Sequence, residues 1–170
     1  MEIRQETKDD YTAVEQVIKD AFATAAQSNG KEHELVHELR SSRAFIPELS
    51  LVAVEDGQII GHILFTKVTV GSHIELALAP LSVLPVYQRR GVGLALMAKG
   101  HQIARAMGYS YVIVLGHASY YAKAGYIPAS SYGIQAPFAV PDENFMILKL
   151  RQDAKNLTGV VKYAQEFGID

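Results

Sequence analysis

Two arginines and two glycines stand together near the centre of the chain, in the segment Gln88-Arg89-Arg90-Gly91-Val92-Gly93. A strand-like apolar run precedes this segment, and a helix-like run begins at Leu94. The first N–H groups of a helix have no partner within the helix and lie at the positive end of its dipole. Glycines let a phosphate approach these groups, and arginines pair with phosphate oxygens. The segment therefore predicts an anion site.

The distribution of acidic residues favours an anionic ligand at the same place. The chain has 18 Asp and Glu residues and a net charge of −2, yet no acidic residue lies between Leu76 and Val140. A carboxylate-free segment suits a polyanion. The same depletion is typical of the buried centre of a sheet, and the two interpretations are compatible. The basic residues of the segment are Arg89, Arg90, Lys99, Arg105 and Lys123.

Two common nucleotide-binding patterns do not match this segment. A P-loop requires Lys followed by Ser or Thr after its second glycine, and that pair is absent. The dinucleotide pattern G-x-G-x-x-G fails at Leu96, where its third glycine should stand. It also needs an acid after the next strand, where the chain has Leu115-Gly116-His117. Adenylate kinases, GTPases and Rossmann dehydrogenases are therefore disfavoured.

Composition sets the class of protein. A chain of 170 residues that is 49% hydrophobic is the size of one ordinary domain with a sizeable core. It contains no cysteine, which excludes disulfides, thiolate nucleophiles and cysteine-based zinc sites. No apolar run approaches the roughly 18 residues of a membrane span, and the start does not resemble a signal peptide. We therefore expect a soluble cytoplasmic protein without a membrane partner.

The hydropathy pattern predicts a single α/β domain over residues 1–170, with a mixed sheet. Asp56-Gly57 is a strong hairpin signal, and Pro80 implies a bulge or an unpaired N–H within its strand. The expected strands are 2–7, 51–55, 58–70, 74–84, 111–115 and 145–150, the expected helices are 11–22, 31–40, 91–107 and 118–124, and a short element is expected at 160–167.

Two motifs resemble a known family. The pattern Q-x-x-G-x-G of the central segment, after the strand-like run that ends at Pro85, resembles motif A of the GNAT superfamily of N-acetyltransferases. The run from Ala118 to Tyr126 resembles the family's short helix, Tyr-x-x-x-Gly-aromatic. The element order extends the resemblance over the whole chain. The ending, from Pro141 to Tyr163, is similar to a subfamily of small bacterial acetyltransferases of poorly defined substrate.

This resemblance implies a fold and a donor. The GNAT fold has a mixed, mostly antiparallel sheet with helices on both faces, and its fourth and fifth strands splay apart to admit acetyl-CoA. Gln88 would brace the loop, and a backbone N–H near Val83 would polarise the acetyl carbonyl. The pantetheine arm would lie along Leu81, Ser82, Val83 and Leu84, and the diphosphate would be held by N–H groups of Arg89, Arg90, Gly91, Val92, Gly93 and Leu94.

The resemblance also implies catalytic residues. Tyr121 is the expected general acid for the departing thiolate, because its ordinary pKa is close to that of an alkyl thiol. The alternative is that Tyr121 only packs in the core. Glu75 and His117 are the two candidates for the general base, with a structural or solvated role as the alternative for each. Water in a preorganised channel is a third possibility for the base.

One rival motif predicts different chemistry. His33-Glu34-Leu35-Val36-His37 is a literal H-E-x-x-H, the helix signature of zinc proteases. Its longer form fails, because Arg40 and Arg43 occupy the positions of the further glycine and histidine. Zinc normally takes at least three protein ligands, and no third ligand is evident. We therefore expect no metal, and a solvated helix face or a lining of the acceptor site.

The sequence thus favours an N-acetyltransferase that moves acetyl from acetyl-CoA to a primary amine by direct attack. The alternative is a non-catalytic acyl-CoA-binding or regulatory module on the same fold. The acceptor is expected to be a small-molecule or peptide amine, and the charge does not suggest nucleic acid. Acceptor specificity is expected to reside in the first two helices and in the loop 129–141. Within this loop, the segment 130–135 is a candidate for closing over the acceptor or for contacting a second subunit in a homodimer.

Overall fold

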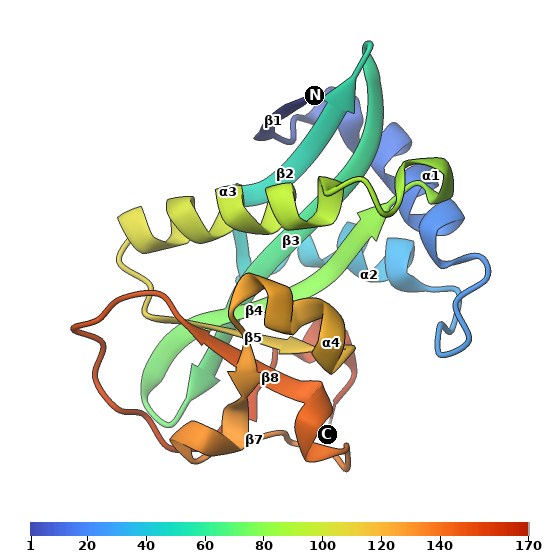
Figure 1. The fold of residues 1–170 in the computed structure, drawn as a ribbon. Helices are drawn as coiled ribbons and strands as arrows, with labels where there is room; N and C mark the ends of the chain where they lie inside the picture. Colours follow the sequence, from blue (N-terminus) through green and yellow to red (C-terminus); the bar gives the residue numbers. More distant parts are fainter. Residues whose placement is uncertain (170) are drawn as a thin grey trace.

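The computed structural model describes residues 1–169, in which nine strands form one twisted sheet (Figure 1). The strands are β1 (Glu2–Gln5), β2 (Phe45–Glu55), β3 (Gln58–Val70), β4 (His73–Val83), β5 (Tyr111–Leu115), β6 (Ile127–Pro128), β7 (Ile134–Gln135), β8 (Phe145–Lys149) and β9 (Gly159–Lys162). The α-helices are α1 (Tyr11–Phe22), α2 (Glu32–Leu39), α3 (Val92–Ala106) and α4 (Ala118–Tyr121).

The main path of the sheet runs β1-β2-β3-β4-β5-β8-β6. All neighbours along this path are antiparallel except β4 and β5, which are parallel. The pairing of β4 with β5 extends only from Leu76 opposite Val112 to Leu78 opposite Val114. Beyond that point β4 continues to Val83 along β3 alone. The sheet is therefore split between its two central strands.

A β-bulge marks the point at which the two strands separate. Ile63 of β3 faces Leu81, whereas Phe65 faces Leu78, so β4 has one residue more than β3 across this interval. The extra length falls at Ala79 and Pro80. Proline has no N–H for the ladder, which explains why the irregularity lies there. The bulge predicted from Pro80 is confirmed.

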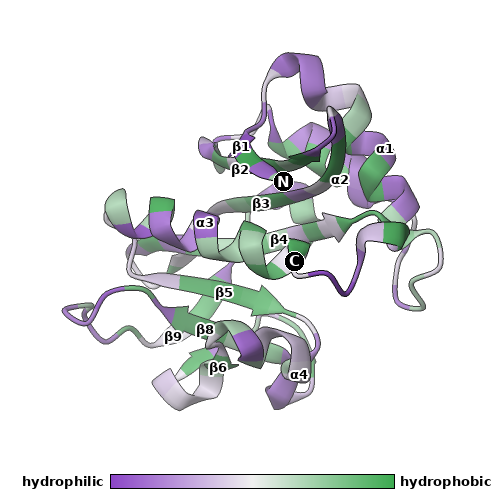
Figure 2. Cartoon of the chain, turned by 45° about the horizontal axis from the view of Figure 1, so that its top comes forward, coloured by the Kyte–Doolittle hydropathy of each residue, from purple (hydrophilic) through white to green (hydrophobic). Residues whose placement is uncertain are grey.

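Helices cover both faces of the sheet, as Figure 1 shows. On one face α3 buries Leu96 and Met97 against the central strands. On the other, Ile18 of α1 and Leu39 of α2 pack with Leu64 of β3. Figure 2 shows the central strands β5 and β8 as largely hydrophobic, in contrast to the mixed colouring of the helices. The mixed, mostly antiparallel sheet with helices on both faces is confirmed.

The C-terminal segment extends the sheet and contributes to a second hydrophobic cluster. Strand β9 pairs antiparallel with the end of β3, where Val70 faces Val161, and it also pairs in parallel with β7. Leu157 and Val161 are buried in a cluster with Ile113 and Phe145. Residues far apart in the sequence thus pack together with β3, β5 and β8. The short strands β6 and β7 were not expected from the sequence.

A buried polar network ties α1 and α2 to the sheet. Arg40, which follows α2, donates hydrogen bonds to Glu6 at 2.6 and 3.3 Å and to Glu15 at 3.2 Å. Ser50 donates to Glu6 at 2.8 Å and lies 3.0 Å from Nε2 of His62. Burial and the nearby charge of Arg40 lower the pKa of His62 to about 3. The imidazole is therefore neutral at physiological pH.

Several element boundaries differ from the prediction by one or two residues, and two elements differ more. The strand expected from Leu51 begins at Phe45 and passes through Pro47, with an irregular register between Phe45 and Ser50 that accommodates the proline. The helix expected over 118–124 consists of α4 and a 3₁₀ turn at Ala122–Ala124. Strand β5 has the predicted bounds. None of the helices within residues 1–169 combines the length and hydropathy that a membrane crossing requires.

Candidate functional site

A cavity of about 720 Å³ lies where the end of β4 meets the first turns of α3 and α4. It collects side chains and backbone from three segments that are far apart in the sequence. Most of the residues expected to bind an anion are in its wall, as are two of the three expected catalytic residues. The lining consists of Leu81, Val83, Tyr87, Gln88, Arg89, Gly91, Val92, Gly93, Leu94, His117, Ser119, Tyr120, Tyr121 and Lys123.

The loop before α3 exposes the start of the helix to this cavity. Gly91 is the N-cap and has a left-handed backbone with φ of 82°, and Arg89 also has a positive φ, of 64°. The Gln88 side chain donates a hydrogen bond from Nε2 to the carbonyl of Val83 at 3.0 Å, which ties the loop to β4. The first N–H groups of α3 have no acceptor within the helix and face a basic loop. This geometry suits a phosphate group.

The open edge of β4 supplies a second set of backbone groups. Leu84 donates to the carbonyl of Ile60 at 2.9 Å, and His62 faces Ser82 in the register. Because hydrogen-bonded pairs alternate along an antiparallel ladder, Ser82 pairs its backbone with β3. The N–H and carbonyl groups of Leu81 and Val83 therefore point to the split side. An amide-containing ligand can add to this edge in the manner of a strand.

Two aromatic rings support Tyr121 at the inner wall of the cavity. Tyr121 meets Tyr120 edge-on at 5.1 Å and Tyr126 at 5.7 Å between ring centroids. Its ring also covers Gly116, where a methyl group would overlap it. Burial raises the pKa of the Tyr121 hydroxyl, so it stays protonated at neutral pH. The hydroxyl is thus available as a proton donor.

Behind this ring, Tyr126 is fixed by a histidine of α3. Its hydroxyl lies 2.7 Å from Nε2 of His101. Burial, with a smaller contribution from Arg105, lowers the pKa of His101 to about 4. A neutral imidazole and a phenol form a satisfied buried pair. The pair gives Tyr121 a rigid support.

The two candidates for the general base lie near opposite ends of β5, Glu75 on the neighbouring strand β4 and His117 just before α4. His117 is exposed, caps α4 and lines the cavity. Glu75 is buried at the other end, where its carboxylate accepts hydrogen bonds from the N–H groups of Ser110 at 2.9 Å and Tyr111 at 3.1 Å. Burial raises the pKa of Glu75, although these hydrogen bonds oppose the shift. The structure does not bring Glu75 to the cavity.

Several expected binding residues lie outside the lining. Leu84 and Arg90 do not contribute to it, and the guanidinium of Arg90 stands 5.6 Å from the ring centroid of Tyr87. Ser82 is buried, with an Oγ that lacks a hydrogen-bond partner. Sequence reasoning missed Tyr87, Ser119, Tyr120 and Lys123 as lining residues. Ser119, Tyr120 and Lys123 carried a signal, because they lie in the run from Ala118 to Tyr126 that resembles the family's short helix.

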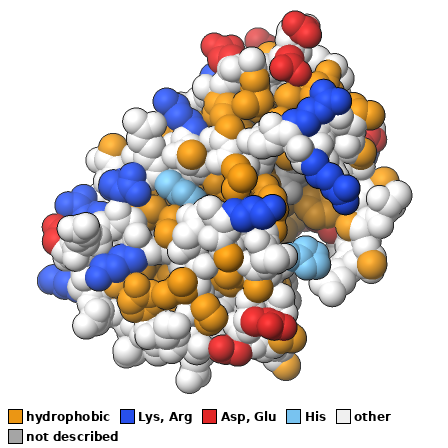
Figure 3. Space-filling model, in the orientation of Figure 1, with side chains coloured by type: hydrophobic (Ala, Val, Ile, Leu, Met, Phe, Trp, Pro, Cys, Tyr) orange, Lys and Arg blue, Asp and Glu red, His pale blue; other side chains and the backbone are white. Residues whose placement is uncertain are grey.

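The surface charge agrees with the position of the cavity. Figure 3 shows Lys and Arg side chains spread across the middle of the face that carries α3. Acidic side chains on the same face gather mainly at its upper and lower margins. The field over the cavity therefore favours a negatively charged ligand.

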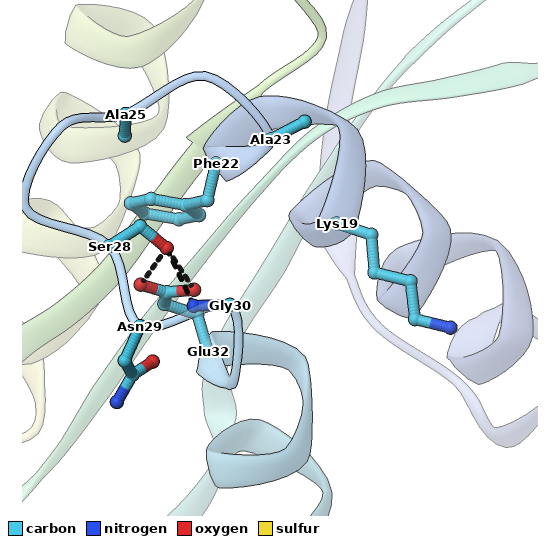
Figure 4. A pocket seen from close by; sticks show the side chains of 8 residues that line it. All are labelled: Lys19, Phe22, Ala23, Ala25, Ser28, Asn29, Gly30 and Glu32. Carbon is cyan, nitrogen blue, oxygen red and sulfur yellow. Dashed lines mark hydrogen bonds between the residues drawn. The ribbon is translucent and has the colours of Figure 1, made fainter.

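A second, smaller cavity of about 360 Å³ lies between the end of α1 and the start of α2 (Figure 4). Ser28 donates from Oγ to the Glu32 carboxylate, with oxygen distances of 2.7 and 2.8 Å, and accepts from the N–H of Gly30 at 3.0 Å. Phe22 forms one wall, and the ammonium of Lys19 points away from the other side chains. The cavity thus offers a carboxylate held in place by a hydroxyl.

The H-E-x-x-H residues lie on α2, where Glu34 and His37 are exposed and His33 is half-buried. Within residues 1–169, no three His, Cys, Asp or Glu side chains are arranged to hold a metal ion. The motif therefore has no third ligand nearby in the described part of the chain.

Comparisons with known proteins agree on one family. Residues 8–126 match the model of the acetyltransferase (GNAT) family. The chain is 38% identical over 165 residues to the uncharacterized N-acetyltransferase YjhQ of Escherichia coli, covering 92% of this chain and 88% of YjhQ.

Two solved structures resemble the fold along nearly its whole length. A GNAT family acetyltransferase from Brucella melitensis, in complex with acetyl-CoA, is 35% identical with a TM-score of 0.80, and the match covers 98% of this chain and 97% of that one. Escherichia coli YhbS, in complex with CoA, is 29% identical with a TM-score of 0.89, and the match covers 98% and 91% of the two chains.

Proposed function

The chain belongs to the acetyltransferase (GNAT) family, and from this premise we propose that it transfers the acetyl group of acetyl-CoA directly to a primary amine. The observation that carries the proposal is the single cavity shared by the start of α3, the open edge of β4 and Tyr121. These three features match the three chemical parts of the donor: its diphosphate, its amide-bearing arm and its thioester.

The donor would bind through backbone groups. Its diphosphate would accept hydrogen bonds from the N–H groups between Arg89 and Leu94, at the positive end of α3. The pantetheine amides would pair with the backbone of Leu81 and with the N–H of Val83, which face the split, while the Val83 carbonyl already accepts a hydrogen bond from Gln88. Complexes of the Brucella melitensis relative with acetyl-CoA and of YhbS with CoA support this assignment of the ligand.

The transfer would then follow from three positions. The acceptor nitrogen attacks the thioester carbon, and a backbone N–H near Val83 stabilises the negative charge that forms on the carbonyl oxygen. The carbon–sulfur bond breaks as the tetrahedral intermediate collapses. The Tyr121 hydroxyl gives its proton to the departing sulfur, which leaves as the CoA thiol.

The amine must lose a proton to become a nucleophile. We assign this role to His117, because it lines the cavity and is open to solvent, and because imidazole is the side-chain group best suited to proton transfer near neutral pH. We assign Glu75 a structural role, in which its carboxylate binds the backbone at the start of β5. The acceptor would approach from the side of α1 and α2, opposite α3.

The test is amine-dependent release of the CoA thiol. Purified protein is incubated with acetyl-CoA and a panel of polyamines, amino acids, aminoglycosides and peptides, and thiol is followed with a chromogenic reagent. We expect at least one amine to accelerate release and to gain the mass of one acetyl group. Binding of acetyl-CoA without release across the whole panel would instead favour a non-catalytic acyl-CoA-binding module.

A further inference from the structure

Tyr120 stands beside the proposed general acid but reaches a different part of the cavity. Its hydroxyl lies against Gly93: a methyl group at that position would overlap Oη and would meet Cζ at 3.4 Å. Gly93 is the second residue of α3, so the hydroxyl is placed over the first turn of this helix. Tyr121, in contrast, lies over Gly116 beyond the end of β5.

The ring of Tyr120 is packed against its neighbours, whereas its hydroxyl has no hydrogen-bond partner in residues 1–169. The ring is half-buried and packs at 85° to the ring of Tyr121. Lys123 of the same wall holds its ammonium 6.0 Å from the centroid of the Tyr120 ring. The hydroxyl makes no hydrogen bond to another residue in 1–169, and burial alone raises its pKa. The phenol is therefore a protonated donor without a protein acceptor.

The chemistry of a donor at this point is specific. Phosphate oxygens only accept hydrogen bonds, and the first N–H groups of α3 approach them from one side. A phenolic O–H over the same turn offers a further donor from α4, and Lys123 adds a positive charge nearby. A phenylalanine would fill the same wall with equal packing but would offer no proton.

We propose that Tyr120 is a positioning residue whose hydroxyl donates a hydrogen bond to the diphosphate of acetyl-CoA. The proposal rests on the proposed function, because it takes the cavity as the acetyl-CoA site. The two adjacent tyrosines then act on different steps. Tyr120 sets the affinity for the donor, whereas Tyr121 sets the rate at which the thiolate leaves.

The variant Tyr120→Phe separates these roles. We expect the Kd for acetyl-CoA to rise roughly tenfold, as for a lost hydrogen bond to a charged group. The kcat at saturating donor and the melting temperature of the free protein should stay close to the wild-type values. Tyr109→Phe is the matched control, because Tyr109 packs against the core outside the cavity. It should leave the Kd unchanged.

Three probes locate the hydrogen bond on the donor: acetyl-CoA, its 3′-dephospho form and S-acetylpantetheine, which has neither diphosphate nor nucleotide. Tyr120→Phe should weaken the first two and leave the third unchanged. Equal weakening of all three would move the contact to the pantetheine arm and overturn the proposal. An unchanged Kd in the variant would sink this inference alone, whereas a wild-type protein that does not bind acetyl-CoA would sink the proposed function with it.

Discussion

At the level of single residues, the proposed reaction depends on a Tyr121 hydroxyl that stays protonated. Tyr121 is surrounded by aromatic rings and carries a raised pKa because of burial. We expect Tyr121→Phe to lower kcat roughly 100-fold, the usual contribution of a general acid, with little change in KM for acetyl-CoA. Steady-state kinetics with a responsive amine measures both. An unchanged kcat would show that another group protonates the sulfur.

The same raised pKa predicts the alkaline pH profile. A raised pKa keeps the hydroxyl protonated up to and beyond its ordinary value of about 10. We therefore expect kcat to show no decline between pH 7 and about pH 10 from loss of the Tyr121 proton. A fall in kcat within this range that disappears in Tyr121→Phe would contradict the raised pKa of Tyr121.

Gln88 acts on the loop rather than on the reaction. Its amide holds the Val83 carbonyl at 3.0 Å, so Gln88→Ala should loosen the anion site. We expect the Kd for acetyl-CoA to rise roughly 3- to 10-fold, the cost of one neutral hydrogen bond. Gln102→Ala, on the exposed side of α3, is the control that should bind normally. Calorimetric titration of both variants makes the comparison.

Local patterns allowed some site residues to be predicted and hid others. Gln88 and the glycines after it lie in a loop and at the start of a helix. This pattern can be recognised from six consecutive residues. Glu75 could not be judged in this way, because its distance from Tyr121 depends on how β5 pairs with β4. Tyr120 was missed because its contact with Gly93 joins two helices that only the fold brings together.

At the level of elements, the buried ion pair of Arg40 attaches α2 to the sheet. The side chains of Arg40 and Glu6 are 5% and 1% exposed, respectively. Removing one partner leaves the other charged and buried, so Arg40→Ala should lower the free energy of unfolding by about 3–5 kcal/mol. Arg4→Ala breaks a pair whose arginine is 36% exposed and should cost under about 1 kcal/mol. Similar losses in denaturant titrations of the two variants would contradict this ranking.

The buried histidines predict a loss of stability in acid. The pKa of His62 is lowered to about 3, and that of His101 to about 4, from an ordinary value near 6.5. Between each folded pKa and about pH 6.5, the unfolded chain therefore binds more protons than the folded protein. The stability contributed by each neutral imidazole is complete above about pH 6.5 and is lost as the pH falls toward the folded pKa.

Urea unfolding at several pH values measures this effect. Each imidazole should contribute a slope approaching about 1.4 kcal/mol per pH unit between pH 6.5 and its folded pKa. His62→Gln should reduce the slope, whatever its effect on total stability. An identical slope in His62→Gln would show that His62 titrates normally.

Most elements of this fold were predictable from the periodicity of hydrophobic residues and from the turn-forming residues between them. The hairpin at Asp56-Gly57 and the strand Tyr111–Leu115 carry strong local signals. The short strands β6 and β7 were not predicted, because two residues are too few to show an alternating hydropathy pattern. The beginning of β2 escaped because Pro47 signals a break, whereas the irregular register of β2 tolerates it. Long-range pairing decides such segments.

At the scale of the whole molecule, the two cavities lie with different helices. The larger cavity and the basic surface lie with α3, and the smaller cavity lies with α1 and α2. Under the proposed function, the donor binds on the side of α3 and the acceptor approaches from the side of α1 and α2. We therefore expect acetyl-CoA to protect the backbone amides on the side of α3 from exchange.

Hydrogen–deuterium exchange with and without acetyl-CoA tests that claim most directly. We expect slower exchange in peptides covering residues 81–94 and 117–123, which form the walls of the larger cavity. Peptides covering 19–32, around the smaller cavity, should exchange as before. Protection of 19–32 without protection of 81–94 would contradict the account.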